Sequence, residues 1–311
     1  MFELFFMFSM ASRLFFGFFV ALVMMSGHAE AQLPDISSVP IDLVVPDVVD
    51  AIPSAGKRVR YSTGSWKTTQ VHHTIWLPAE WTPPQQTQTR MPIIVEWGGN
   101  GGFRNDFGDT CTGLVDDCKL GWGMTGGQRV IWICLPYLDE TSSNNQVHWW
   151  GNSPDFDPNP TLEYARATID DTCLRFGGDP ARVVLAGFSR GALACNRLGL
   201  ADDTISPLWR GFVCYSHYDG VVESWPYSSA DRVHAHARLE KLAGRPQFIC
   251  GEGNDADRTR DYLAHTGIRG DFTITGTGFR NHSDAWILRP SPARSLLRQW
   301  LSKVLSLEID P

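Results

Sequence analysis

The segment from Gly187 to Gly191, read GFSRG, constrains the fold of this chain more than any other stretch because of its surroundings. A short apolar, β-branched run, Arg182 to Ala186, precedes it, and a helix-like sequence, Ala192 to Leu200, follows it. A strand, a tight Gly-x-Ser-x-Gly turn and a helix in this order hold Ser189 in a strained backbone conformation, with its hydroxyl exposed above a sheet. The five letters alone occur often by chance, and the flanking elements make the pattern informative.

The remainder of the chain alternates apolar strands with helices. We expect strands at residues 58–62, 69–77, 92–97, 129–135, 182–186, 211–215, 247–250 and 272–275, and helices at residues 161–176, 192–200, 231–242, 257–266 and 291–305. This alternation predicts an α/β fold with a mostly parallel central sheet and helices on both faces. A nucleotide-binding doubly wound domain is the rival, but the glycine-rich segment Gly98–Gly102 lacks both the Lys-Ser/Thr of a phosphate loop and a complete G-x-G-x-x-G motif.

The N-terminus has the pattern of a secretory signal peptide. Arg13 precedes an apolar run from Leu14 to Met25, and Ala-Glu-Ala at 29–31 supplies the small residues before a cleavage site ahead of Gln32. We therefore expect a secreted or periplasmic protein with no stable membrane association after cleavage. An uncleaved anchor is the alternative, although the run is short for a span of about 20 residues. The chain is expected to divide into a signal peptide (1–31), an extended N-terminal arm or linker rich in proline (32–57) and the folded domain (58–311).

Charge and cysteine content exclude several classes of function. The net charge of −7 and the lack of a Lys/Arg block disfavour nucleic acid as a partner. Export implies an oxidising compartment, and seven cysteines leave at least one thiol without an intrachain partner. Cys111 and Cys118 flank a short polar loop and form the predicted disulfide. With no CxxC motif, and no ordered ligand spacing among the aspartates of residues 106–117, we expect no metal site.

A serine hydroxyl becomes a nucleophile only when a base accepts its proton and a carboxylate orients that base. Such groups should follow the carboxyl ends of parallel strands. His282 follows the last predicted strand and is the expected base. The loop after residues 247–250 supplies the acid, for which Asp255 is the first choice, Asp257 the second and Glu252 the third.

Two preorganised N–H donors are needed for an oxyanion. The backbone of Arg190 supplies one, and the glycine-rich turn after residues 92–97 supplies the other through Gly99 or Asn100. With these elements the chain resembles the α/β-hydrolase superfamily over residues 58–307, in which nucleophile, acid and base follow in the order Ser189, Asp255 and His282. Trp97 stands where many members of that superfamily have histidine.

The resemblance implies an exported serine hydrolase that cleaves carboxylic esters through an acyl-enzyme, without a cofactor. The chain is loosely similar to secreted feruloyl esterases and polyhydroxybutyrate depolymerases, which implies a small-molecule or polymer-linked ester as substrate. Trp149, Trp150 and His217 lie in loops next to the serine strand and suit a ring-bearing acyl group or a sugar face. A serine peptidase on the same fold and a non-catalytic carbohydrate-binding protein on a hydrolase scaffold are the alternatives.

Overall fold

The computed structural model describes residues 33–307 and 309. The predicted signal peptide lies outside the described residues. Contacts gather Leu33–Pro311 into one unit. Within the described part of the chain, no helix combines the length and the apolar character that a bilayer crossing requires.

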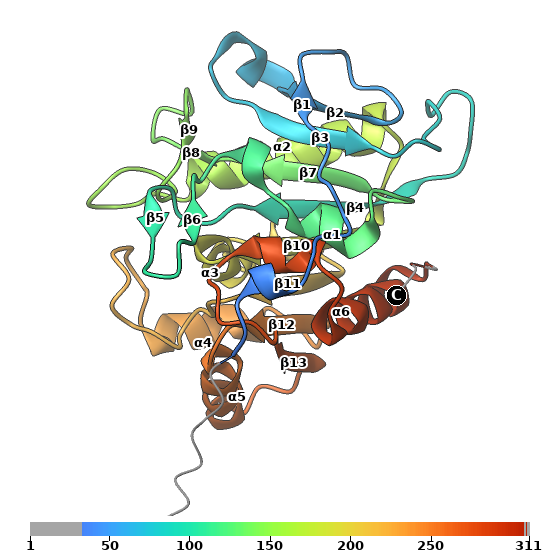
Figure 1. Cartoon of the computed structure of the whole chain (residues 1–311). Coiled ribbons are helices and arrows are strands. Elements are labelled where there is room, and N and C mark those ends of the chain that lie inside the picture. The colour runs from blue at the N-terminus through green and yellow to red at the C-terminus, as the bar shows by residue number, and fades with distance from the viewer. Residues whose placement is uncertain (1–32, 308, 310–311) are drawn as a thin grey trace, which may run out of the picture. The chain divides into compact units, whose positions relative to one another are not determined.

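A nine-stranded sheet forms the centre of the described chain (Figure 1). Strand β3 is antiparallel to both of its neighbours, and all other neighbouring strands are parallel. In spatial order the strands are β1 (Val48–Val49), β2 (Lys57–Tyr61), β3 (His73–Leu77), β7 (Ile131–Leu135), β4 (Met91–Trp97), β10 (Gly178–Phe188), β11 (Gly211–Tyr215), β12 (Gln247–Gly251) and β13 (Phe272–Gly276). Two short antiparallel pairs lie outside the sheet: β5 (Phe103–Arg104) with β6 (Thr110–Cys111), and β8 (Tyr137–Leu138) with β9 (Asn145–Gln146).

Side chains alternate between two cores along each central strand, as the period of a strand requires. In β4, Ile93 and Val95 belong to one core and Ile94 to the other. Helices α2 (Asn159–Arg175), α3 (Arg190–Arg197), α4 (Arg232–Glu240) and α5 (Asp255–Thr266) contribute to the first core, and α1 (Leu120–Thr125) and α6 (Pro292–Leu305) to the second. Five 3-10 turns complete the described elements: η1 (Ile36–Ser38), η2 (Gly64–Thr68), η3 (Val115–Asp117), η4 (Ser206–Leu208) and η5 (Asp284–Leu288).

This architecture confirms the predicted fold class, a mostly parallel sheet with helices on both faces. The strand order also positions the site, because β10, β12 and β13 run in the same direction and end at one edge of the sheet. Element boundaries shift by a few residues from those expected. The important shift is at α5, which begins at Asp255, two residues earlier than the sequence predicts.

The segment after the expected cleavage site packs on the second core. Ile36, Val39, Leu43 and Val45 contact the cluster that α1 and α6 also cover. In Figure 1 this segment is the blue chain that leads from η1 to β1. Its apolar side chains explain why it lies along the domain, since their burial removes apolar surface from water.

The predicted Cys111–Cys118 disulfide is absent, because all seven cysteines have free thiols. Cys111 closes the β5–β6 pair opposite Phe103. The thiol of Cys118 instead lies within 4.8 Å of the thiol of Cys134 and a carboxylate oxygen of Glu96. Both cysteines lie at the second core, Cys118 buried in it and Cys111 partly buried against it, but the thiol of Cys118 faces Cys134 and Glu96.

Candidate active site

Ser189 occupies a sharp turn between β10 and α3. Its φ of 54° and ψ of −115° lie outside the regions that most residues adopt. The turn fits only because of its glycines: a Cβ on Gly187 would lie 2.0 Å from the carbonyl oxygen of Gly191, and one on Gly191 would lie 2.0 Å from that of Trp97. The N–H of Ser189 donates to the carbonyl of Tyr215 at 2.9 Å, which fixes the turn to β11.

His282 lies in the loop after β13 and reaches the serine. Its Nε2 is 3.0 Å from Ser189 Oγ. The imidazole packs between aromatic rings, with its centroid 4.6 Å from that of Phe103 and 5.0 Å from that of Phe188. The structure therefore brings together the nucleophile and the base that the sequence predicts.

Glu252, the third choice from sequence, takes the place expected for Asp255. Its Oε1 accepts a hydrogen bond from Nδ1 of His282 at 2.5 Å, and its side chain is only 13% exposed. The expectation for Asp255 is wrong because this residue is the first of α5, where its carboxylate pairs with Arg258 at 3.4 Å. Asp257, two residues further along the same helix, pairs with Arg260.

The electrostatics of Glu252 agree with its contacts. Burial alone would raise the pKa of Glu252, but the hydrogen bond and the charge of His282 outweigh burial and hold that pKa below its ordinary value. Asp255 has the opposite shift: burial, followed by the nearby charge of Glu252, raises its pKa to about 6. The carboxylate that faces His282 is thus the one whose ionised form its surroundings stabilise.

Ser216 is a member of the site that the sequence analysis did not single out. Its Oγ lies 2.9 Å from Oε1 of Glu252 and 2.8 Å from Nδ1 of His282, so it contacts both partners of the acid–base pair. Its φ of 86° is rare for a residue other than glycine. Ser216 is the first residue past β11, and that position is the signal by which the sequence could have revealed it.

The two expected oxyanion donors come from neighbouring segments. The backbone amides of Gly99, Asn100 and Arg190 donate no hydrogen bond to any other part of the described chain. The side chain of Arg190 is buried, stacks on Tyr137 with 3.9 Å between its Cζ and the ring centroid, and donates to the carbonyl of Gly99 at 2.7 Å. The residue after the serine therefore also orients the peptide between Gly99 and Asn100.

The three predicted substrate-binding residues have different surroundings. Trp150 is fully buried against Tyr137 and Tyr227, so the expectation that it contacts substrate is wrong. His217 lies beside the base, with 5.3 Å between its ring centroid and that of His282. Burial, and then the charge of His282, lowers the pKa of His217 to about 4, so its ring is neutral at pH 7.

Trp149 belongs to an aromatic row that begins at His217. The ring of Trp225 is 5.2 Å from His217 and 5.9 Å from Trp149, and both tryptophans are partly buried. The row thus connects the loop before α2 with the loop after β11. Its rings extend from His217, beside the base, through Trp225 to Trp149.

One group of side chains in the described residues has the spacing of metal ligands: Glu96, Cys118 and Cys134. Both oxygens of Glu96 already accept hydrogen bonds. The donors are the N–H groups of Lys119, Leu120 and Gly121 at the start of α1, and the indole of Trp132. Glu96 therefore acts as a cap for α1, where the unpaired N–H groups of a helix need acceptors.

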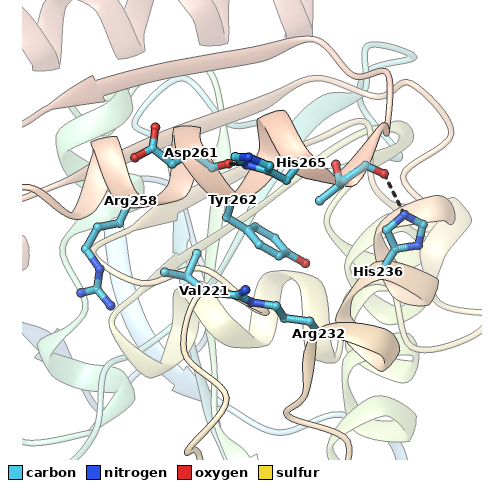
Figure 2. Close-up of a pocket in the computed structure, with 8 residues that line it drawn as sticks. Val221, Arg232, His236, Arg258, Asp261, Tyr262 and His265 are labelled. Carbon is cyan, nitrogen blue, oxygen red and sulfur yellow. Dashed lines mark hydrogen bonds between the residues drawn. The ribbon is translucent and has the colours of Figure 1, made fainter.

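A cavity of about 590 Å³ lies between α4 and α5. Figure 2 shows Tyr262 at its centre, with Arg232 and Arg258 beside it and His236 bonded to the carbonyl of Thr266. Its arginines already have acidic partners, Glu223 for Arg232 and Asp255 for Arg258. Its lining contains none of Ser189, Glu252 and His282, so the cavity is separate from the reaction site.

Comparison with known proteins finds similar solved structures. No protein-family model matches the sequence, and no curated protein matches it. The similar structures include a ferulic acid esterase (15% identity over 79% of this chain and 96% of the other, TM-score 0.49) and a fungal esterase from Rhizomucor miehei (12%, 81% and 83%, 0.48). They also include the acylaminoacyl peptidase of Pyrococcus horikoshii (11% identity, TM-score 0.48). That alignment covers 82% of this chain but only 43% of the peptidase. All of these scores lie below 0.5, and the fold of this chain stands on its own strand order.

Proposed function

We propose that this chain, an α/β-hydrolase by its fold, is an exported serine hydrolase that cleaves carboxylic esters through an acyl-enzyme. One observation carries the proposal. Ser189, His282 and Glu252 follow three strands of one sheet and form a continuous row of hydrogen bonds, with the serine held at a positive φ. This is the geometry of a nucleophile, a base and the acid that orients the base. Export rests on the signal-peptide pattern of residues 1–31.

Acylation follows from these contacts. As Ser189 Oγ attacks the ester carbonyl carbon, its proton passes to Nε2 of His282, and the negative charge of Glu252 stabilises the imidazolium that forms. The carbonyl oxygen becomes an oxyanion, for which Arg190 and the turn at Gly99 and Asn100 supply unoccupied N–H donors. The C–O bond of the ester then breaks, and the alcohol leaves with the proton from His282.

Deacylation reverses the roles with water as the nucleophile. His282 accepts a proton from water, the hydroxide attacks the acyl carbon, and Ser189 leaves with the proton that His282 returns. The products are one carboxylic acid and one alcohol, and Ser189 and His282 return to their starting protonation states. No step needs a cofactor.

The aromatic row from His217 to Trp149 supports a choice of acyl group. An acyl or leaving group with a flat ring would find stacking partners in Trp149 and Trp225 within reach of the base. We therefore propose aryl or arylacyl esters as the substrate class, with Trp149 and His217 as the contacts.

The proposal is tested with the mature protein, residues 32–311. A fluorophosphonate probe should label the native protein but not Ser189→Ala, and p-nitrophenyl esters should be hydrolysed only by the native protein. Labelling that persists in Ser189→Ala, or a native protein that is neither labelled nor active, contradicts the proposal. A matched pair of an arylacyl ester and the corresponding anilide separates esterase from peptidase activity.

A further inference from the structure

We propose that Asp35 of the N-terminal arm and Asp109 hold Asn281 between them and so position His282. Both aspartates are positioning residues, since they act through the histidine loop. The inference rests on the proposed function, because it concerns the geometry of the same base.

Asn281 is the centre of this arrangement. It directly precedes His282 and is only 2% exposed. Its Nδ2 donates to Oδ1 of Asp109 at 2.9 Å and to Oδ2 of Asp35 at 3.2 Å, while its Oδ1 accepts the N–H of Ile36 at 2.8 Å. Both amide protons and the amide oxygen are therefore in use, which leaves this side chain one orientation.

Asp109 holds the base directly. Its Oδ2 accepts the backbone N–H of His282 at 2.9 Å and the side-chain amide of Asn105 at 2.8 Å. Because this carboxylate is buried and each contact is charge-assisted, the bonds are stronger than neutral ones. Asp109 thus fixes the main chain from which the imidazole extends.

The arm holds the residue before Asn281 as well. Asp35 Oδ2 accepts from the guanidinium of Arg280 at 3.0 Å, and the N–H of Arg280 donates to the carbonyl of Pro34 at 3.1 Å. Three consecutive residues, 280 to 282, are therefore held by the arm or by Asp109. We call the contacts of Asp35 and Asp109 with residues 280–282 the clamp. The predicted cleavage before Gln32 would leave two residues ahead of Pro34, so the clamp would lie at the mature N-terminus.

The position of His282 matters because the transfer of a proton from Ser189 depends on a short contact. Nε2 is 3.0 Å from Oγ, and a displacement of about 1 Å in such a site can lower the rate roughly a hundredfold. The loop that carries His282 has no regular backbone hydrogen bonds of its own, as a helix or strand has, to prevent that displacement. The clamp supplies bonds from two other segments.

The chain offers a matched control in the same arm. Asp42 also pairs with an arginine, Arg294 of α6, through both of its carboxylate oxygens. Loss of either ion pair should loosen the arm, but only loss of the Asp35 contacts should loosen the histidine loop. Asp42→Asn therefore separates a general effect on the arm from an effect on the base.

The experiment compares Asp35→Asn, Asp109→Asn and Asp42→Asn in the mature protein. We expect Asp35→Asn and Asp109→Asn to lower kcat roughly tenfold to a hundredfold, with KM nearly unchanged and sites counted by fluorophosphonate titration. We expect Asp42→Asn to keep kcat at assay temperatures well below every Tm. If Asp35→Asn keeps the kcat of Asp42→Asn, the inference is overturned.

Hydrogen exchange gives a readout that does not depend on turnover. Peptides that cover residues 279–284 should exchange faster in Asp35→Asn than in Asp42→Asn, because Arg280 and Asn281 lose their contacts with Asp35 and the loop opens more often. Equal exchange in the two variants would overturn the clamp. If exchange differs but the native protein is neither labelled nor active, the proposed function fails while the clamp on residues 280–282 stands. Asp35 is partly exposed, so its variant is expected to fold even if Asp109→Asn does not.

Discussion

Replacement of Glu252 by glutamine removes the charge that faces His282 and keeps the shape of the side chain. In the native protein a carboxylate oxygen lies 2.5 Å from Nδ1, and little water reaches the pair. The centres of the carboxylate and the imidazolium are then about 4 Å apart, and at an effective dielectric constant of about 20 their attraction is about 4 kcal/mol. That attraction exists mainly in the transition state, when His282 carries the proton.

A loss of about 4 kcal/mol corresponds to roughly a thousandfold in rate. The amide oxygen of glutamine can still accept the Nδ1 proton, so we expect kcat/KM of Glu252→Gln to fall roughly a hundredfold to a thousandfold. Hydrolysis of p-nitrophenyl acetate, normalised to sites titrated with a fluorophosphonate, measures this change. Ser189 stays in place in the variant, and slow labelling should persist.

Asp255→Asn is the matched control for Glu252→Gln. Both substitutions replace a carboxylate by its amide, three residues apart, but only Glu252 contacts His282. We expect Asp255→Asn to change kcat/KM by less than about tenfold, since its charge acts on the base only through space. A larger loss in Asp255→Asn than in Glu252→Gln would refute the assignment of the acid.

Three further outcomes follow from the site. Arg190→Met keeps the backbone donor of residue 190 but loses the bond to the carbonyl of Gly99. We expect kcat to fall by up to about a hundredfold, which is the lower limit of the range for loss of one oxyanion donor; an unchanged kcat would show that the side chain has no part in the mechanism. Trp149→Ala should raise KM about threefold to tenfold for an arylacyl ester but not for an acetyl ester, whereas Trp150→Ala should lower Tm without such selectivity because it empties a core position. The pKa of Asp255 is raised to about 6, so between about pH 4 and 6 its carboxyl group binds more protons in the folded state than in the unfolded state, and the stability of the native protein falls as pH rises through that window. The Tm of Asp255→Asn minus the Tm of the native protein should therefore be more positive at pH 8 than at pH 4. A difference that does not change with pH would contradict the raised pKa.

The sheet and two members of the triad follow from local patterns in the sequence. Apolar runs between glycines predict the central strands, since buried parallel strands are apolar on both faces. The glycines at 187 and 191 predict the turn because the structure leaves no room for a Cβ at either position. His282 follows from its place after the last strand.

The prediction of Asp255 as the acid is wrong because the choice among the carboxylates depends on where β12 ends, and β12 ends one residue later than expected. β12 continues to Gly251, so Glu252 is the first residue beyond the sheet, while Asp255 begins α5. The sequence cannot fix these ends, because polar residues after a strand suit both a loop and the first turn of a helix. Trp150 was misplaced for a related reason: a tryptophan in a polar loop can serve the core or a surface, and only the packing against Tyr137 and Tyr227 decides.

Apart from Ser216, whose place just past β11 is a signal in the sequence, the groups that hold the triad could not have been predicted, because their contacts join positions far apart in the chain. Ser216 and Glu252 are separated by 36 residues, Asp109 and His282 by 173, and Asp35 and Asn281 by 246. Asp35, Asp109 and Asn281 lie in no motif, and aspartate and asparagine are common in turns and caps. Their roles follow from the strand order, which brings the ends of β11, β12 and β13 together, and from the arm, which crosses to the loop after β13. The triad is therefore encoded locally at strand ends, whereas the groups that hold it in place are encoded by the topology.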